Sequence, residues 1–120
     1  MQNFRSLKVW ERAHALTLDV YRLTRSFPKD ELYGLTSQLR RACASIGLNL
    51  AEGGGYATDK ARANATQIAI ASSCEVEYAL LLARDLGYVA EPMYVDLDAR
   101  VGEARKMLVG LAAHFRKAER

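Results

Sequence analysis

The sequence has few of the residues that metal sites require. It contains two cysteines and two histidines in 120 residues, with neither a CxxC pair nor the His/Cys spacing of a metal site. Glu11 and His14 form one Glu-x-x-His step. A di-iron bundle needs two such steps, and Leu111 stands three residues before His114, where the second would need a glutamate. The sequence therefore predicts no metal and no cofactor.

Signals of catalysis are also missing. No serine lies in a nucleophile motif, and no Ser/His/Asp set is suggested. The glycine run 53–55 lacks the preceding strand and the following Lys-Ser/Thr of a P-loop, so we expect it to end a helix. Glu75 and Glu77 are two residues apart on a predicted helix and point in different directions, unlike an acid–base pair. We expect no catalytic residue and no enzymatic activity.

Long apolar runs are absent as well. No stretch approaches the roughly 20 apolar residues that span a bilayer. Residues 1–13 lack the basic start and apolar run of a signal peptide. These absences predict a cytoplasmic protein with no membrane partner. In that reducing compartment, Cys43 and Cys74 are expected to be buried free thiols.

Helical periodicity, by contrast, is strong. Apolar residues recur at intervals of three and four, and no segment alternates with a period of two. We predict helices over 5–26, from 31–35 to 53, from just after Thr58 to 86, and over 92–117. Short connections make sequential helices antiparallel neighbours. The fold class is therefore all-α, an antiparallel up-and-down four-helix bundle in a single domain, residues 1–120.

The predicted core consists of one apolar stripe on each helix. The stripes are Val9, Ala13, Leu16, Val20, Leu23 and Phe27 on the first helix; Leu35, Leu39, Ala42, Ile46 and Leu50 on the second; Ala65, Ile68, Ser72, Val76, Ala79, Ala83 and Leu86 on the third; and Leu97, Val101, Ala104, Leu108, Leu111 and Phe115 on the fourth.

The second helix carries a polar stripe opposite its apolar one. Its members are spaced three or four residues apart and differ from the Lys/Glu-rich face of an ordinary surface helix: Gln38, Arg41, Ser45, Asn49 and Glu52, with Arg40 beside them. The stripe could bind a phosphate or sugar edge, because arginine forks match phosphate geometry. The interpretation that we favour is a subunit interface whose polar groups satisfy one another. Glu75 is expected level with the start of this helix, paired with Arg40 or Arg41.

Surplus apolar residues predict self-association. The segment 76–83 surrounds the third helix with apolar groups, whereas a monomeric bundle needs one stripe per helix. Trp10, Thr17 and Tyr21 form a second side on the first helix. We therefore expect a homo-oligomer.

The charge distribution leaves room for a nucleic-acid surface. Seventeen basic against fourteen acidic residues give a net charge of +3, and all of this excess lies in residues 1–60. Lys8, Arg12 and Arg22 could share one outer face of the first helix and contact RNA or DNA. The alternative is a solvated face balanced by Glu11 and Asp19.

Three segments together resemble a known family: FRSLKVWERA, FPKDELYGLTSQLRRACASIGLNLAEGGG and EVEYALLLARDLGY. They are similar to the small bacterial four-helix bundles called 23S rRNA intervening-sequence proteins, or S23. The shared residues include Trp10, Phe27, Pro28, Gly34, Gln38, Arg41, Ser45, Asn49, Glu52, Gly53 and Glu75. The chain departs from the family pattern at Tyr56, where an arginine is usual, and at Ala61, Arg62 and Ala65, where a Glu-Phe pair and aromatics are usual.

The resemblance implies a bundle that assembles into homopentamers. Some family members are encoded within insertions in 23S rRNA genes, and a similar bundle is the nucleic-acid-binding accessory protein of diversity-generating retroelements. The expected function is that of a non-enzymatic homo-oligomeric, pentameric scaffold or adaptor. The alternative is a nucleic-acid-binding accessory protein.

Overall fold

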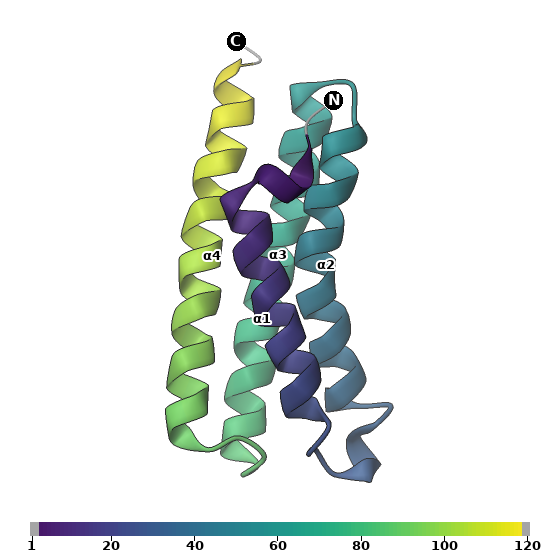
Figure 1. Cartoon of the computed structure of the whole chain (residues 1–120), viewed down its shortest axis with the longest axis vertical. Helices are drawn as coiled ribbons and strands as arrows, with labels where there is room; N and C mark the ends of the chain where they lie inside the picture. Colours follow the sequence, from purple (N-terminus) through teal and green to yellow (C-terminus); the bar gives the residue numbers. More distant parts are fainter. Residues whose placement is uncertain (1–2, 119–120) are drawn as a thin grey trace.

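The computed structural model describes residues 3–118 and consists of helices in that range. Two short 3-10 helices, η1 (Phe4–Ser6) and η2 (Lys29–Glu31), precede the first two long helices. The long helices are α1 (Lys8–Thr24), α2 (Leu35–Gly55), α3 (Asp59–Asp85) and α4 (Glu91–Ala118). They run up and down in sequence, with both ends of the chain at the same end of the bundle (Figure 1). The predicted fold class is confirmed.

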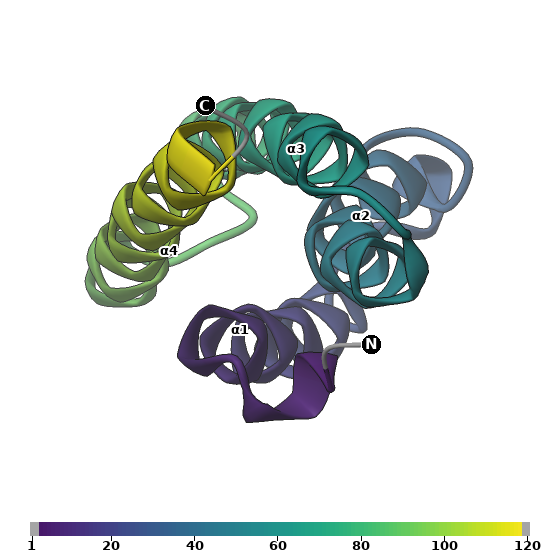
Figure 2. The ribbon, with the colours of Figure 1, turned by 90° about the horizontal axis from the view of Figure 1, so that it is seen from above.

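Seen along its axis, the bundle is a ring in which each helix lies beside the next (Figure 2). α3 packs most extensively, against α2 on one side and α4 on the other, whereas α1 closes the ring by a smaller contact with α4. The bundle is elongated, with extents of 47 × 23 × 20 Å. Because α1 is the shortest of the four long helices, it covers only part of the length of α2 and α4, the two helices beside it.

The predicted core stripes of the first, second and fourth helices are confirmed, apart from Leu23 and Leu111, which are only partly buried. The stripe predicted for α3 is wrong in part. Ala65, Val76, Ala79 and Ala83 are buried as predicted, but Ile68 and Leu86 are about half exposed and Ser72 is only partly buried. Ala69, Ser73 and Leu80, which were not predicted, are buried as well. The reason is that α3 faces two long neighbours at once. The buried face of α3 therefore lies between α2 and α4. It is shifted by about one residue from the stripe of larger apolar residues.

The predicted end of α2 at the first glycine is also wrong, because the helix continues to Gly55. A glycine in a helix costs about 1 kcal/mol relative to alanine. Gly53 and Gly54 are nevertheless buried against the rest of the bundle, and a methyl group added to Gly53 would meet the Cβ atom of Ala65 at 3.7 Å. Packing against α3 thus extends the helix beyond the point where propensity alone would end it.

Local signals set the ends of α3 as expected. The Thr58 hydroxyl oxygen accepts a hydrogen bond from the Ala61 amide at 3.1 Å, which makes it the N-cap. Gly87 follows the helix with a φ of +82°, and the Tyr88 amide donates to the Ala83 carbonyl at 2.9 Å. The left-handed backbone at Gly87 therefore turns the chain toward α4.

The two cysteines lie in different environments, so the prediction of two buried thiols is wrong for one of them. Cys43 is fully buried and Cys74 is exposed on α3. Burial raises the pKa of the Cys43 thiol, an effect that the Thr17 hydroxyl partly offsets by its contact with Sγ at 3.4 Å. Cys43 is thus a protonated packing residue at neutral pH.

Candidate interaction surfaces around α2

The polar stripe predicted on α2 divides into parts with different neighbours. Arg40 turns away from the stripe toward α1. Its Nε donates to the Thr24 hydroxyl at 2.7 Å, its Nη2 donates to the Tyr21 carbonyl at 3.3 Å, and its guanidinium lies 4.8 Å from the centre of the Tyr21 ring. Arg40 therefore links α2 to α1 and does not lie beside Glu75.

The middle of the stripe is an internal hydrogen-bond network. Asn49 is only 8% exposed, and its amide nitrogen donates to the Ser45 carbonyl at 2.8 Å and to the Ser45 hydroxyl at 3.0 Å. Ser72 of α3 donates to the same Ser45 hydroxyl at 2.9 Å. Ser45 and Asn49 thus satisfy each other and join α2 to α3, so they have little capacity left for a ligand.

The start of the stripe lines a polar hollow of about 410 Å³ between α2 and α3. Its six lining residues are Tyr33, Gly34, Ser37, Gln38, Arg41 and Glu75. Arg41 and Glu75 are both exposed, and neither has an ion pair with any residue in the range 3–118. Glu75 and Arg41 therefore line the same hollow, but the expected pairing of Glu75 with Arg40 or Arg41 is absent within residues 3–118. Glu52 is exposed and lies eleven residues beyond Arg41, roughly 16 Å along the helix.

The other flank of α2 forms an apolar groove with α1 and η1, of about 510 Å³. Its lining combines large apolar side chains with small residues of α2: Phe4, Trp10, His14, Thr17, Leu18, Tyr21, Ala44, Gly47, Leu48 and Ala51. We call this surface the apolar groove. The sequence indicated its Trp10, Thr17 and Tyr21 side but missed the contribution of α2, because only the packing of two helices creates it.

Aromatic contacts fix the upper part of the apolar groove. The Trp10 ring stacks on the His14 ring, with ring centroids 4.8 Å apart, and forms a T-shaped contact with the Phe4 ring, with centroids 5.1 Å apart. A methyl group added to Gly47 would come within 3.3 Å of the Trp10 indole nitrogen. Glycine at this position therefore allows the indole ring to lie close against α2. His14 is thus a stacking residue, and in the described ranges no three His, Cys, Asp or Glu side chains gather into a metal-binding group.

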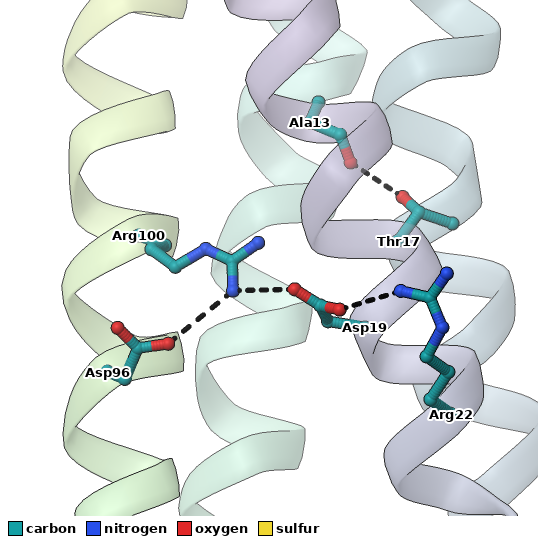
Figure 3. A network of polar contacts seen from close by, with 6 residues as sticks. All are labelled: Ala13, Thr17, Asp19, Arg22, Asp96 and Arg100. Carbon is teal, nitrogen blue, oxygen red and sulfur yellow. Dashed lines mark hydrogen bonds and ion pairs between the residues drawn. The ribbon is translucent and has the colours of Figure 1, made fainter.

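The basic residues predicted on α1 are mostly paired. Arg12 forms an ion pair with Glu103 of α4, and Arg22 bonds Asp19 at 2.9 Å. Asp19 also accepts a hydrogen bond from Arg100 of α4 at 2.9 Å (Figure 3). The bond from Arg100 is the main cause that lowers the Asp19 pKa, with Arg22 contributing and partial desolvation opposing. Of the three predicted nucleic-acid contacts, only Lys8 has no recorded ion pair within residues 3–118.

These features define a small helical-bundle protein with an apolar groove and a polar hollow on its outside. None of the described helices combines the length and the hydropathy needed to cross a membrane. The family model described as 23S rRNA-intervening sequence protein matches residues 5–110. The chain therefore belongs to this family.

A solved structure supports the fold. A protein of unknown function from the S23 ribosomal protein family of Bacteroides thetaiotaomicron superposes with a TM-score of 0.80 over 88% of this chain and 95% of that chain. Its sequence is 20% identical, so the likeness shows the fold alone. No curated protein matches the chain in sequence. The description of the family names no enzymatic reaction.

Proposed function

We propose that the protein is a non-enzymatic, homo-oligomeric scaffold or adaptor of the cytoplasm, pentameric by its resemblance to the S23 family. The apolar groove is the observation that carries this proposal. It places Trp10, Leu18 and Leu48 together on the outside of a small bundle, with Leu18 at 42% and Leu48 at 58% exposure. Grouped apolar surface of this kind is typical of an interface, since single exposed apolar residues are ordinary but grouped ones are not.

Most of the apolar segment 76–83 of α3, which was expected to drive association, packs inside the bundle. Val76, Ala79, Leu80 and Ala83 are buried within the bundle, and only Tyr78 is strongly exposed, at 64%. Exposed apolar residues also lie on α3 and α4, among them Ile68, Tyr78 and Val95, but the apolar groove gathers several of them at one place on the α1–α2 side. Covering a few hundred Å² there is worth several kcal/mol at roughly 25 cal/mol per Å², before the costs of association.

The proposal predicts that a charge in the apolar groove breaks the assembly. Leu48→Lys should convert the oligomer to the monomer in multi-angle light scattering at micromolar concentration, because a buried lysine without a partner is strongly unfavourable in an interface. Val109→Lys is the matched control, since Val109 is 52% exposed on α4 and does not line the groove. A wild-type protein of monomeric mass would contradict the proposal.

Arg41 tests whether the interface extends from the apolar groove into the polar hollow. Arg41→Ala should weaken the assembly by roughly 3–5 kcal/mol if a neighbouring copy buries Arg41 against a carboxylate, because the orphaned partner then stays buried and unpaired. Sedimentation velocity across a dilution series measures the change. An unchanged assembly would show that the hollow stays solvated and that the interface is confined to the groove.

A nucleic-acid-binding accessory protein is the second candidate, favoured by the charge excess in residues 1–60. An oligomer would repeat each basic patch and so strengthen weak phosphate contacts. RNA or DNA binding should then be detectable at low salt and weaken steeply as salt rises. Lys8→Gln should reduce it, whereas Arg12→Gln and Arg22→Gln should matter less because both arginines already pair with carboxylates. Undetectable binding at low salt would remove this candidate.

A further inference from the structure

We propose that the corner between the end of α1 and the start of α2 is a binding site for a small phosphomonoester. A hollow of about 180 Å³ lies there, and its polar lining comprises Thr24, Arg25, Lys29, Thr36 and Arg40. We call it the basic corner. It is separate from the apolar groove and from the polar hollow, which share none of its lining residues. The proposal does not depend on the oligomeric state.

The basic corner concentrates positive charge that the protein does not neutralise. Three of its lining residues are cations and none is acidic. In the described chain, no ion pair involves Arg25, Lys29 or Arg40, although six other arginines do form ion pairs: Arg12, Arg22, Arg62, Arg84, Arg100 and Arg105. Like charges gathered around a concave surface attract an anion. The basic corner is thus chemically different from the paired arginines elsewhere on the bundle.

Nearby carboxylates do not remove this charge. Glu31 does not line the hollow and forms no ion pair with these cations; its Oε1 accepts from the Leu35 amide at 3.2 Å and its Oε2 accepts from the Tyr88 hydroxyl at 2.9 Å. Asp30 is exposed and does not line the hollow. The three cations therefore face the basic corner without an acidic partner in it.

Arg40 is held in place before any anion arrives. Two of its guanidinium nitrogens are bonded to Thr24 and to the Tyr21 carbonyl, and its plane lies over the Tyr21 ring. The third, Nη1, has no recorded partner. Anion binding to a half-buried cation that neutral groups hold in place is favourable for two reasons. The anion compensates for the lost solvation of the cation, and little further side-chain entropy is lost on binding. Arg40 is therefore the central residue of the proposed site.

The size and the charge of the basic corner favour a phosphomonoester. Such a group carries about −1.5 to −2 charges at neutral pH and three strong acceptor oxygens, which suits three cations better than a singly charged carboxylate or phosphodiester does. The buried Thr36 lines the hollow with a hydroxyl that can donate to a phosphate oxygen. Phe27 and Leu32 supply an apolar wall for a small organic part.

Titration with glycerol 3-phosphate, followed by amide NMR shifts at low ionic strength, tests the proposal. Saturable shifts are expected at Thr24, Arg25, Lys29, Thr36 and Arg40, and equal concentrations of glycerol should cause none. The double variant R25Q/K29Q should raise Kd by about tenfold or more, because two charge-assisted contacts are lost. Arg22→Gln is the matched control: this cation lies on the same turn of α1 but pairs with Asp19, and its loss should change Kd by less than about twofold.

Three results would overturn the proposal: no saturable shift, an equal loss of affinity in Arg22→Gln and in the double variant, or displacement of glycerol 3-phosphate by an oligonucleotide that lacks a terminal phosphate. The last would make the basic corner a contact for a nucleic-acid backbone. Arg40→Gln can disturb packing between α1 and α2, so the exposed Arg25 and Lys29 carry the test. Circular dichroism of the double variant verifies that the helices are intact.

Discussion

The contacts that hold α3 and those that hold α1 against α4 differ in chemistry. α3 meets both of its neighbours through small and aliphatic residues, and Ala69, Leu80 and Ala83 are all fully buried. α1 contributes a buried apolar face as well, but charged groups span its border with α4. Arg12 pairs with Glu103, and Asp19 pairs with Arg100 (Figure 3). Apolar burial stabilises a fold strongly, whereas exposed ion pairs add about 0–1 kcal/mol each.

The comparison indicates a division of roles between the two regions. Small residues on α3 allow α2 and α4 to pack closely against it, and the contacts of α3 with these two helices are the most extensive in the bundle. We call this part of the bundle the tight half. The charge pairs between α1 and α4 are exposed and add little energy. Polar contacts also cross the tight half. Arg105 of α4 donates to the buried Ser73 hydroxyl at 2.9 Å and so satisfies it, and it forms an ion pair with Glu77 of α3, while Ser72 of α3 donates to the Ser45 hydroxyl of α2.

The largest effect is expected from a cavity in the tight half. Leu80→Ala should lower the free energy of unfolding by about 2–5 kcal/mol, because it removes a fully buried side chain from closely packed surroundings. Urea unfolding followed by circular dichroism at fixed protein concentration measures it. Leu86→Ala, at the C-cap of the same helix, is the control, since Leu86 is 50% exposed and its truncation should cost less than about 0.5 kcal/mol. Equal losses in the two variants would contradict the assigned packing of α3.

Overfilling the same region should have the next largest effect. Ala69→Leu should destabilise the fold by about 1–3 kcal/mol, because a fully buried alanine between two helices leaves no room for three more carbons. Ala71→Leu, at an exposed position two residues away, serves as the control and should be nearly neutral. If Ala69→Leu left the unfolding midpoint unchanged, the close approach of α3 to its neighbours would not depend on small residues.

Periodicity in the sequence predicted the four helices and most of the core, because spacing of three and four depends only on local geometry. The failures come from tertiary packing. Ile68 looked like a core residue on α3, but the presence of two long neighbours moved the buried arc to Ala69 and Ser73. The run 53–55 looked like a helix end, but burial extended α2 to Gly55.

The candidate surfaces were harder to predict than the fold. Adjacent residues on a helix point about 100° apart. The orientation of α2 about its own axis therefore determines that Arg40 reaches α1 and that Arg41 lines the polar hollow. The apolar groove depends on Gly47 and Leu48 lying beside Trp10, thirty-seven or more residues away in sequence. Only the absence of a side chain at Gly47, an uncommon choice inside a helix, gave a local signal of this contact.

A smaller effect is expected at the charged border of α1. Asp19→Asn should cost about 1 kcal/mol at neutral pH, since it removes the charge that Arg22 and Arg100 share, and the Asp19 side chain is 42% exposed and therefore partly screened. The pKa of Asp19 is lowered in the folded state, chiefly by the bond from Arg100. Its stabilising contribution is therefore complete above the unfolded pKa of about 3.9 and disappears as pH falls through the lower folded value.

The pH dependence separates this charge effect from a packing effect. The stability difference between the wild type and Asp19→Asn should be constant from neutral pH down to about 4 and then shrink, because protonated Asp19 is nearly equivalent to asparagine. The difference made by Leu80→Ala should not shrink in this way, since no titrating group is removed. Asp98→Asn, which removes a carboxylate of α4 with no recorded ion pair in the described chain, should cause little change. If Asp19→Asn remained less stable than the wild type at acidic pH, the contact between α1 and α4 would depend on packing and not on the charge of Asp19.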